Sequence, residues 1–160
     1  MNEREELLAR LTDKDAGAAC AFADAVAAES RESDRYFLYL DDFAALLRHK
    51  NSLVRNRAIS ILAALARWDT QNRYDALMGE FLPHITDEKP ITARQCIKAL
   101  PEIAAAKPNL IPQIRSTLEN ADLDGYRDSM QPLILKDIVG ALQQLAALEK
   151  KSEKIIDDLN

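Results

Sequence analysis

The chain has 160 residues, of which 48% are hydrophobic and 29% charged, and its formal net charge at pH 7 is −5. This length is typical of one domain with one core, and a composition rich in Ala, Leu, Glu, Arg and Lys with only four Gly favours helices over sheet. The acidic balance argues against a general binder of nucleic-acid phosphates, because such proteins carry an excess of basic residues.

The sequence predicts neither a signal peptide nor a membrane-spanning segment. The N-terminal sequence MNEREELLARL is charged and amphipathic, and no uninterrupted apolar run approaches the roughly 18 residues that cross a bilayer. Cys20 and Cys96 lie on apolar helical faces, a position typical of buried, reduced thiols. We therefore expect a cytoplasmic protein that does not contact a membrane.

The first 30 residues predict two helices. One covers residues 3–11, and the second runs from Ala16 to about Glu29 with Asp13 or Asp15 as its cap. Residues 1–30 match the repeat described below poorly. We interpret them as a degenerate first unit, because the terminal units of a helical stack are often atypical.

Residues 34–67 predict a hairpin of two antiparallel helices. Ser33 or Asp34 can cap the first helix, whose apolar residues follow at steps of four, three and four, as on one helical face. These residues are Tyr36, Leu40, Phe43 and Leu47. The polar turn at residues 48–52 is short, so the second helix, from Leu53 to Arg67, returns antiparallel to the first.

Much of this hairpin recurs 38 residues later, in residues 71–106. The matched apolar pairs are Tyr36 and Tyr74, Leu40 and Met78, Phe43 and Phe81, Leu47 and Ile85, Leu53 and Ile91, Ile59 and Ile97, Leu62 and Leu100, Leu65 and Ile103, and Ala66 and Ala104. Nine matches in one register indicate a helical repeat protein. In this unit Asn72 is the expected cap, residues 86–90 form the turn, and Pro101 is expected to kink the second helix.

Residues 108–149 predict a fourth unit with a longer internal loop. Its first helix begins 36 residues after the first helix of the third unit, whereas its second helix begins about 42 residues after the second helix of that unit. About six extra residues therefore lie in the segment 122–131, before Pro132 opens the second helix. The tail, 150–160, is polar, but three apolar residues predict a short helix that closes the end of the stack. They are Ile155, Ile156 and Leu159.

Residues 46–66, LLRHKNSLVRNRAISILAALA, resemble a HEAT-type repeat, with a polar turn and then a Val-Arg-x-x-Ala opening to the second helix. Residues 81–104 carry the pattern in weakened form. The resemblance implies an all-α fold, an α-α superhelix of about four antiparallel pairs and about eight main helices in one domain, with the second helices on the concave side. It also implies that Arg55 braces neighbouring units and that the ligand is most often a protein.

Signals of catalysis or metal binding are absent. The only two histidines, His49 and His84, have no neighbouring carboxylate, and no Gly-rich phosphate loop, G-x-S-x-G motif or His/Cys metal spacing occurs. Asp122-x-Asp124-Gly lacks the further acidic ligands of a calcium loop. We predict no catalytic, cofactor or metal site.

The register places several polar residues at equivalent positions of successive second helices. Asn56, Arg94 and Lys136 form one row, and Lys98 lies one turn further along its helix. These side chains predict a shallow groove for an acidic segment of a partner protein. An ordinary solvated helix face is the alternative.

The segment 122–131 is a second candidate site. It combines an aromatic ring, a cation and a flexible apolar side chain, a mixture favoured at interfaces. The residues concerned are Tyr126, Arg127, Ser129 and Met130. The alternative is an insertion packed on itself. Trp68, the only Trp, ends its helix and is expected to cover the junction between units.

The most economical function is a non-catalytic adaptor or scaffold that binds another protein. Two alternatives stay open on the same scaffold: a nucleic-acid-binding protein similar to HEAT-like repair enzymes, and a cofactor-attachment factor of the lyase type. A monomer is favoured over a homodimer.

Overall fold

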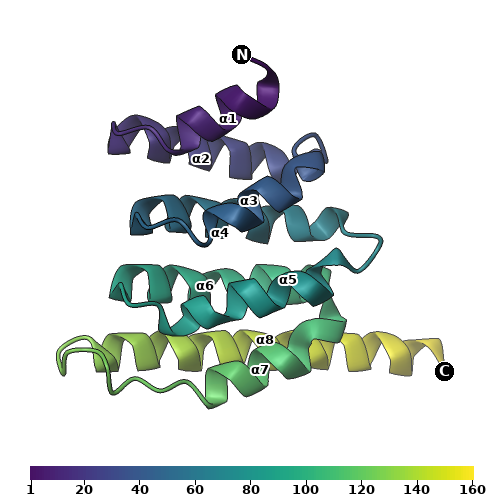
Figure 1. The fold of residues 1–160 in the computed structure, drawn as a ribbon. Helices are drawn as coiled ribbons and strands as arrows, with labels where there is room; N and C mark the ends of the chain where they lie inside the picture. Colours follow the sequence, from purple (N-terminus) through teal and green to yellow (C-terminus); the bar gives the residue numbers. More distant parts are fainter.

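The computed structural model describes all 160 residues and contains helices and turns only, which confirms the predicted all-α fold. Eight α-helices form four antiparallel pairs that stack on one another (Figure 1). The first helices of the pairs are α1 (Glu3–Leu11), α3 (Leu40–Leu46), α5 (Arg73–Phe81) and α7 (Ile111–Glu119). The second helices are α2 (Ala16–Ser30), α4 (Ser52–Leu65), α6 (Pro90–Ala106) and α8 (Gln131–Leu159).

Short 3-10 turns adjoin several helices. They cover Phe37–Tyr39, Ala66–Trp68, Leu82–Thr86 and Pro108–Leu110. The turns inside the pairs all emerge at one edge of the stack and the connections between pairs at the other (Figure 1). None of the helices combines the length and the apolar content of a membrane-crossing segment.

Local sequence explains where most helices begin. The side chains of Asn2, Asp15 and Asn51 each accept a hydrogen bond from a backbone N–H in the first turn of α1, α2 and α4. Pro90 opens α6 with the backbone angle that a first helical turn requires. These caps satisfy N–H groups that have no partner inside the helix.

One apolar core runs through the whole stack. Each second helix packs against the next, so that α2, α4, α6 and α8 form a continuous layer. The largest side chains with almost no exposure include Phe43, Tyr74 and Phe81, which come from the first helices and fill the space between the layers. Burial of each such side chain contributes about 1.5–3 kcal/mol.

The segment before α3 differs from the prediction. A helix beginning after Ser33 or Asp34 does not form, and a 3-10 turn precedes α3, which begins at Leu40. The buried Tyr39 hydroxyl donates to a Glu3 carboxylate oxygen at 2.8 Å, and the Arg35 guanidinium also pairs with Glu3. Contacts to α1, and not the helical periodicity of the segment itself, therefore determine its conformation.

The predicted cap at Asn72 is also wrong. Asn72 has a φ of 56°, in the left-handed region, and its side chain does not cap α5. Asp69 caps the helix instead, because its two carboxylate oxygens accept the N–H groups of Arg73 and Tyr74, each at 2.9 Å. The Asn72 amide oxygen accepts a hydrogen bond from Lys107 Nζ at 2.8 Å.

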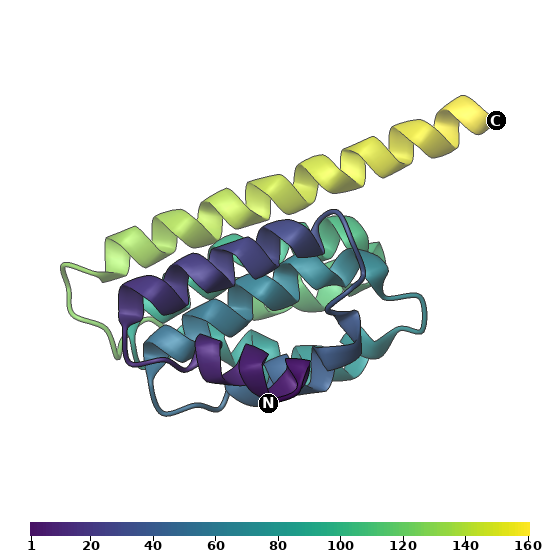
Figure 2. The ribbon, with the colours of Figure 1, turned by 90° about the horizontal axis from the view of Figure 1, so that it is seen from above.

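The predicted closing helix over residues 150–160 does not form as a separate element. Helix α8 continues unbroken to Leu159, and its end projects beyond the other helices (Figure 2). Ile155, Ile156 and Leu159 are therefore exposed and do not close the stack. No Gly or Pro lies between residues 141 and 160 to end the helix. The predicted burial of Cys20 is wrong too, since Cys20 is exposed whereas Cys96 is buried.

Candidate functional site

We call the outer side of the second helices the second-helix face. A row of apolar residues crosses it. Leu53, Ile91 and Leu133 occupy equivalent positions at the beginnings of α4, α6 and α8, and they are 46%, 69% and 41% exposed. The register had matched Leu53 with Ile91 as an apolar pair, but neither lies in the core. Because large apolar residues recur on the surface at one position of three successive units, this row is a candidate interaction site.

The polar row lies one turn further along the same helices, and only part of it is free. Arg94 Nε donates to Asp137 Oδ2 at 2.6 Å, so its charge connects α6 to α8. Lys98 Nζ lies 3.8 Å from the same carboxylate, although its side chain is 60% exposed. Lys136 is exposed and forms neither an ion pair nor a hydrogen bond. The structure thus brings two of the predicted cations, Arg94 and Lys98, together at Asp137, a partner that the sequence did not indicate, and leaves Lys136 apart from them.

A groove of about 220 Å³ lies between α2 and α4 on the second-helix face. It is lined by Ala16, Cys20, Ala23, Asp24, Leu53, Asn56, Arg57, Ser60 and Gln95. The Asn56 side-chain oxygen is buried without a hydrogen-bond partner. Ser60 Oγ accepts a hydrogen bond from Gln95 Nε2 at 2.6 Å, which joins α4 to α6 beside the groove.

Arg57 is the most unusual residue of this groove. It is only 6% exposed, and Nη1 donates to the carbonyl of Leu11, the last residue of α1, at 2.8 Å. That contact suits a cation, because the carboxyl end of a helix carries partial negative charge. Nε and Nη2 donate to no protein group, and no carboxylate pairs with the guanidinium. The groove therefore presents a cation with unused donors.

The opposite end of the second-helix face is closed by ion pairs. Arg31 of the α2 carboxyl end binds both Glu102 carboxylate oxygens, at 2.9 and 3.1 Å. Arg67 Nη2 donates to the same carboxylate at 3.0 Å, and its Nη1 donates to the Arg31 carbonyl. Two guanidinium groups therefore share one carboxylate, and these contacts connect α2, the turn after α4, and α6.

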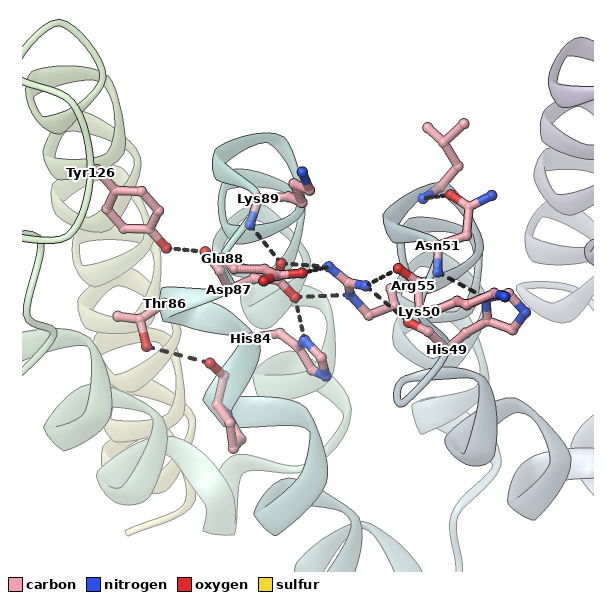
Figure 3. A network of polar contacts seen from close by, with 12 residues as sticks. His49, Lys50, Asn51, Arg55, His84, Thr86, Asp87, Glu88, Lys89 and Tyr126 are labelled. Atoms are coloured by element: carbon pink, nitrogen blue, oxygen red, sulfur yellow. Dashed lines mark hydrogen bonds and ion pairs between the residues drawn. The ribbon is translucent and has the colours of Figure 1, made fainter.

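A buried polar network connects the turns at the loop edge (Figure 3). Arg55 binds both carboxylate oxygens of Asp87, at 2.8 and 3.0 Å, and its Nη1 donates to the carbonyls of His49 and Lys50. His84 Nδ1 lies 2.7 Å from Asp87 Oδ2, so the expectation that neither histidine has a carboxylate neighbour is wrong for His84. Arg55 thus holds together the turns of two units.

The environment of Asp87 keeps it ionised. Burial alone would raise the pKa of this carboxyl, but hydrogen bonds from Arg55, the Lys89 N–H and His84 outweigh burial and lower the pKa. The carboxylate oxygens are occupied by partners within the protein. The network therefore braces the stack and leaves little capacity to bind a ligand.

The long loop of the fourth unit joins this network. The Tyr126 hydroxyl donates to the Asp87 carbonyl at 2.5 Å (Figure 3). The ring is therefore held against the chain and is partly buried. Tyr126 and Met130 both pack against the core, whereas Arg127 and Ser129 are exposed. The four predicted loop residues thus do not form one surface.

Trp68 lies at the opposite edge, at the junction between units. Its Nε1 donates to the Ser30 carbonyl at 2.6 Å, and its ring packs against the core. At the next junction Lys107 Nζ donates to the Asp69 carbonyl at 3.1 Å. Each of the two contacts connects residues that are 38 positions apart, and the second contact lies 39 positions after the first.

No group of three or more His, Cys, Asp or Glu side chains is arranged to hold a metal ion. Comparisons of the chain with protein-family models, with curated proteins and with solved structures find no match.

Proposed function

We propose that this chain is a non-catalytic, HEAT-like scaffold that binds a segment of another protein on its second-helix face. The observation that carries the proposal is the exposed apolar row of Leu53, Ile91 and Leu133. All three residues lie outside the core cluster and do not pack against it. A partner that covers the row removes this apolar surface from water.

The spacing of the row suggests the form of the partner segment. Packed helices lie about 8–10 Å apart, so successive anchors in the row are separated by a similar distance. A polyproline II segment advances about 9 Å in three residues and repeats its side-chain direction over the same three. A segment with an apolar residue at every third position fits the row.

Acidic residues of the partner would find cations next to the apolar row. Lys136 is free, Lys98 is largely exposed, and Arg57 has unused donors in the groove beside Leu53. Exposed pairs contribute mainly to orientation and association rate, whereas a carboxylate that reaches Arg57 gains a charge-assisted hydrogen bond in a less hydrated site.

Two features favour a protein partner over the alternatives. Arg94 pairs with Asp137, and Arg31 and Arg67 share Glu102, so these ion pairs offset part of the positive charge that would bind a phosphate backbone. The groove between α2 and α4, at about 220 Å³, is smaller than the roughly 300–1,000 Å³ typical of cofactor and drug-sized ligand sites, and the larger hollow of about 450 Å³ beside Pro101, Gln144 and Leu148 lies away from the apolar row.

Affinity capture from an extract of the native cells tests the proposal. The full-length chain should retain a partner that Ile91→Asp and Leu133→Asp both lose. Leu38→Asp is the matched control, because Leu38 is equally apolar and 71% exposed but belongs to the turn before α3. A partner that Ile91→Asp retains, or that Leu38→Asp also loses, would contradict the proposed surface.

A further inference from the structure

Helix α8 carries an apolar strip on the side that faces away from the stack. We call it the C-terminal end face, and it consists of Leu135, Val139, Leu142 and Ala146. Leu135 and Val139 are 54% and 45% exposed, Ala146 is exposed and Leu142 is partly buried. The neighbouring side of α8, about 100° around the helix and with Ile134, Ile138 and Leu145, packs into the core.

The residues equivalent to this strip on α4 and α6 show what kind of surface it is. Val139 corresponds to Ile97 of α6 and Ile59 of α4, and both of those residues are 0% exposed. Leu142 corresponds in the same way to Leu100 and Leu62, which are also 0% exposed.

The contacts of Arg55 show the direction in which this side of a second helix faces. Arg55, the equivalent of Leu135, reaches forward to Asp87 of the next unit. On α4 and α6 this side therefore packs against the following second helix. The strip on α8 has the apolar residues of such an interface, but α8 has no following helix that could cover them.

Helices α7 and α8 both lie at this end of the stack (Figure 1), but only α8 has an exposed apolar strip there. The exposed residues of α7 are Pro112, Gln113, Ser116 and Glu119, of which only Pro112 is apolar. A complete fifth helix pair would cover α7 as well as α8. The pattern instead fits one helix lying along α8, as in a helix-to-helix contact between two molecules.

We propose that α8 pairs antiparallel with α8 of a second copy of this chain, through the C-terminal end face and about a twofold axis near Leu142. A twofold contact uses the same strip on both copies and closes the assembly as a dimer. The proposal replaces the monomer expected from the sequence, and it does not depend on the partner of the second-helix face.

Charge and length support the antiparallel arrangement. Glu149 still pairs with Arg115 of α7, whereas residues 150–159 are all exposed and extend α8 beyond the body (Figure 2). This extension begins with a basic segment, KKSEK, at residues 150–154. The loop before α8 is acidic, with Asp122, Asp124 and Asp128 against Arg127.

At a rise of about 1.5 Å per residue, Lys154 lies about 18 Å from Leu142, and the beginning of α8 lies about 16 Å from it on the other side. An antiparallel pair therefore places the basic segment of each copy level with the acidic loop of the other. A parallel, head-to-tail contact with α2 of the next copy would not bring these two segments together.

Sedimentation velocity of the purified full chain tests the dimer. The expected species has twice the chain mass of 17.9 kDa. Val139→Lys and Leu135→Glu should each raise the dimer dissociation constant at least tenfold, while circular dichroism shows unchanged helix content. Leu38→Lys, at an exposed apolar position outside α8, should leave the dimer intact. A monomer at all concentrations, or a dimer that both α8 variants retain, would overturn the proposal.

A cysteine at position 142 tests the orientation. Helices with axes about 8–10 Å apart bring facing Cα atoms to about 4–5 Å, within the range of a disulfide. Mild oxidation of Leu142→Cys, combined with Cys20→Ser to remove the exposed native thiol, should give a covalent dimer. Lys154→Glu should weaken the dimer about tenfold, and Asp128→Lys in the same chain should restore it. Failure of the disulfide to form in a dimeric sample would refute the antiparallel pair.

Discussion

Single side chains connect neighbouring units through two buried ion pairs. Arg55 reaches from α4 to Asp87 in the turn of the next unit, and both side chains are almost completely buried. Lys107 lies close to Asp69, with its Nζ 3.4 Å from the carboxylate, at the junction before α7. Each charge is kept in the interior by its partner, so removal of one partner leaves the other without compensation.

The variant Asp87→Asn measures how strongly the first pair stabilises the stack. It removes the charge that compensates Arg55 and weakens the contact with His84, so we expect a loss of about 3 kcal/mol in the free energy of unfolding. Urea denaturation gives this value. Glu88→Gln is the matched control, since Glu88 is 77% exposed and 3.9 Å from Arg55, and it should cost less than about 0.5 kcal/mol. Equal losses would contradict the assigned role of Asp87.

The same carboxylate predicts a dependence of stability on pH. The pKa of Asp87 is lowered in the folded chain, so its contribution is fully present above the unfolded value of about 3.9 and disappears as the pH falls through the lower, folded value. The free energy of unfolding should therefore fall below about pH 4. The decrease should be smaller in Asp87→Asn, and identical slopes in both proteins would contradict the prediction.

Side-chain partners were the least predictable part of the site. Tyr126 donates to a backbone carbonyl 39 residues away, and Arg94 pairs with an aspartate 43 residues away. Neither partner has a local sequence signal, because only the stacking of units brings them together. The bracing role of Arg55 was predictable from its place in the repeat pattern. The register could not show which cations on the surface are free and which form ion pairs.

Among the helices, α5 depends on a cap that lies outside its own first turn. Asp69 accepts two N–H groups of α5, and Lys107 approaches it from the next unit. Burial opposes ionisation of Asp69, but these backbone hydrogen bonds and the ammonium group of Lys107 lower the pKa of the carboxyl. One residue thus connects the beginning of α5 with the end of α6.

Asp69→Ala should cost about 2–4 kcal/mol, because the cap is lost and Lys107 is left buried without its carboxylate. Thermal unfolding and urea denaturation measure the effect. Asp75→Ala removes an exposed aspartate from the first turn of the same helix and should cost less than about 1 kcal/mol. A small effect of Asp69→Ala would show that Asn72 or solvent can replace the cap.

Helix boundaries were predictable where caps and apolar periodicity agree. Helix α2 has Asp15 before a run of small apolar residues and was predicted to within one residue of its end, and α6 begins at Pro90, the last residue of the predicted turn 86–90. The beginning of α3 was not predictable, since Glu3 of another helix determines the position of Tyr39. The length of α8 was missed because its polar end lacks any stop signal.

At the scale of the whole molecule, the 38 buried apolar residues of the core form one cluster that extends from Leu7 to Leu145. Such continuity couples the units, so we expect a single cooperative unfolding transition. Hydrogen exchange should show the highest protection in α4 and α6, which have neighbours on both sides, and the lowest in residues 150–159. Separate transitions for the first and last units would contradict this expectation.

The architecture was predictable from sequence because nine apolar matches share one register, and a stack of helix pairs buries eight of the nine pairs; only Leu53 and Ile91 stay exposed. The surfaces were less predictable. Periodicity marks Leu53, Ile91 and Val139 as apolar but does not indicate whether the chain itself buries them, and in the folded chain they are 46%, 69% and 45% exposed. The second-helix face and the C-terminal end face therefore emerged only from the structure.

Photo-crosslinking in the native cells tests the proposed function most directly. A photoreactive phenylalanine derivative at position 91 should form an adduct with one defined protein, and Lys136→Glu in the same chain should reduce the yield of that adduct. The same derivative at position 38, which is also exposed and apolar, should form no adduct with that protein. The absence of any adduct from position 91, or equal yields from positions 91 and 38, would contradict binding at the second-helix face.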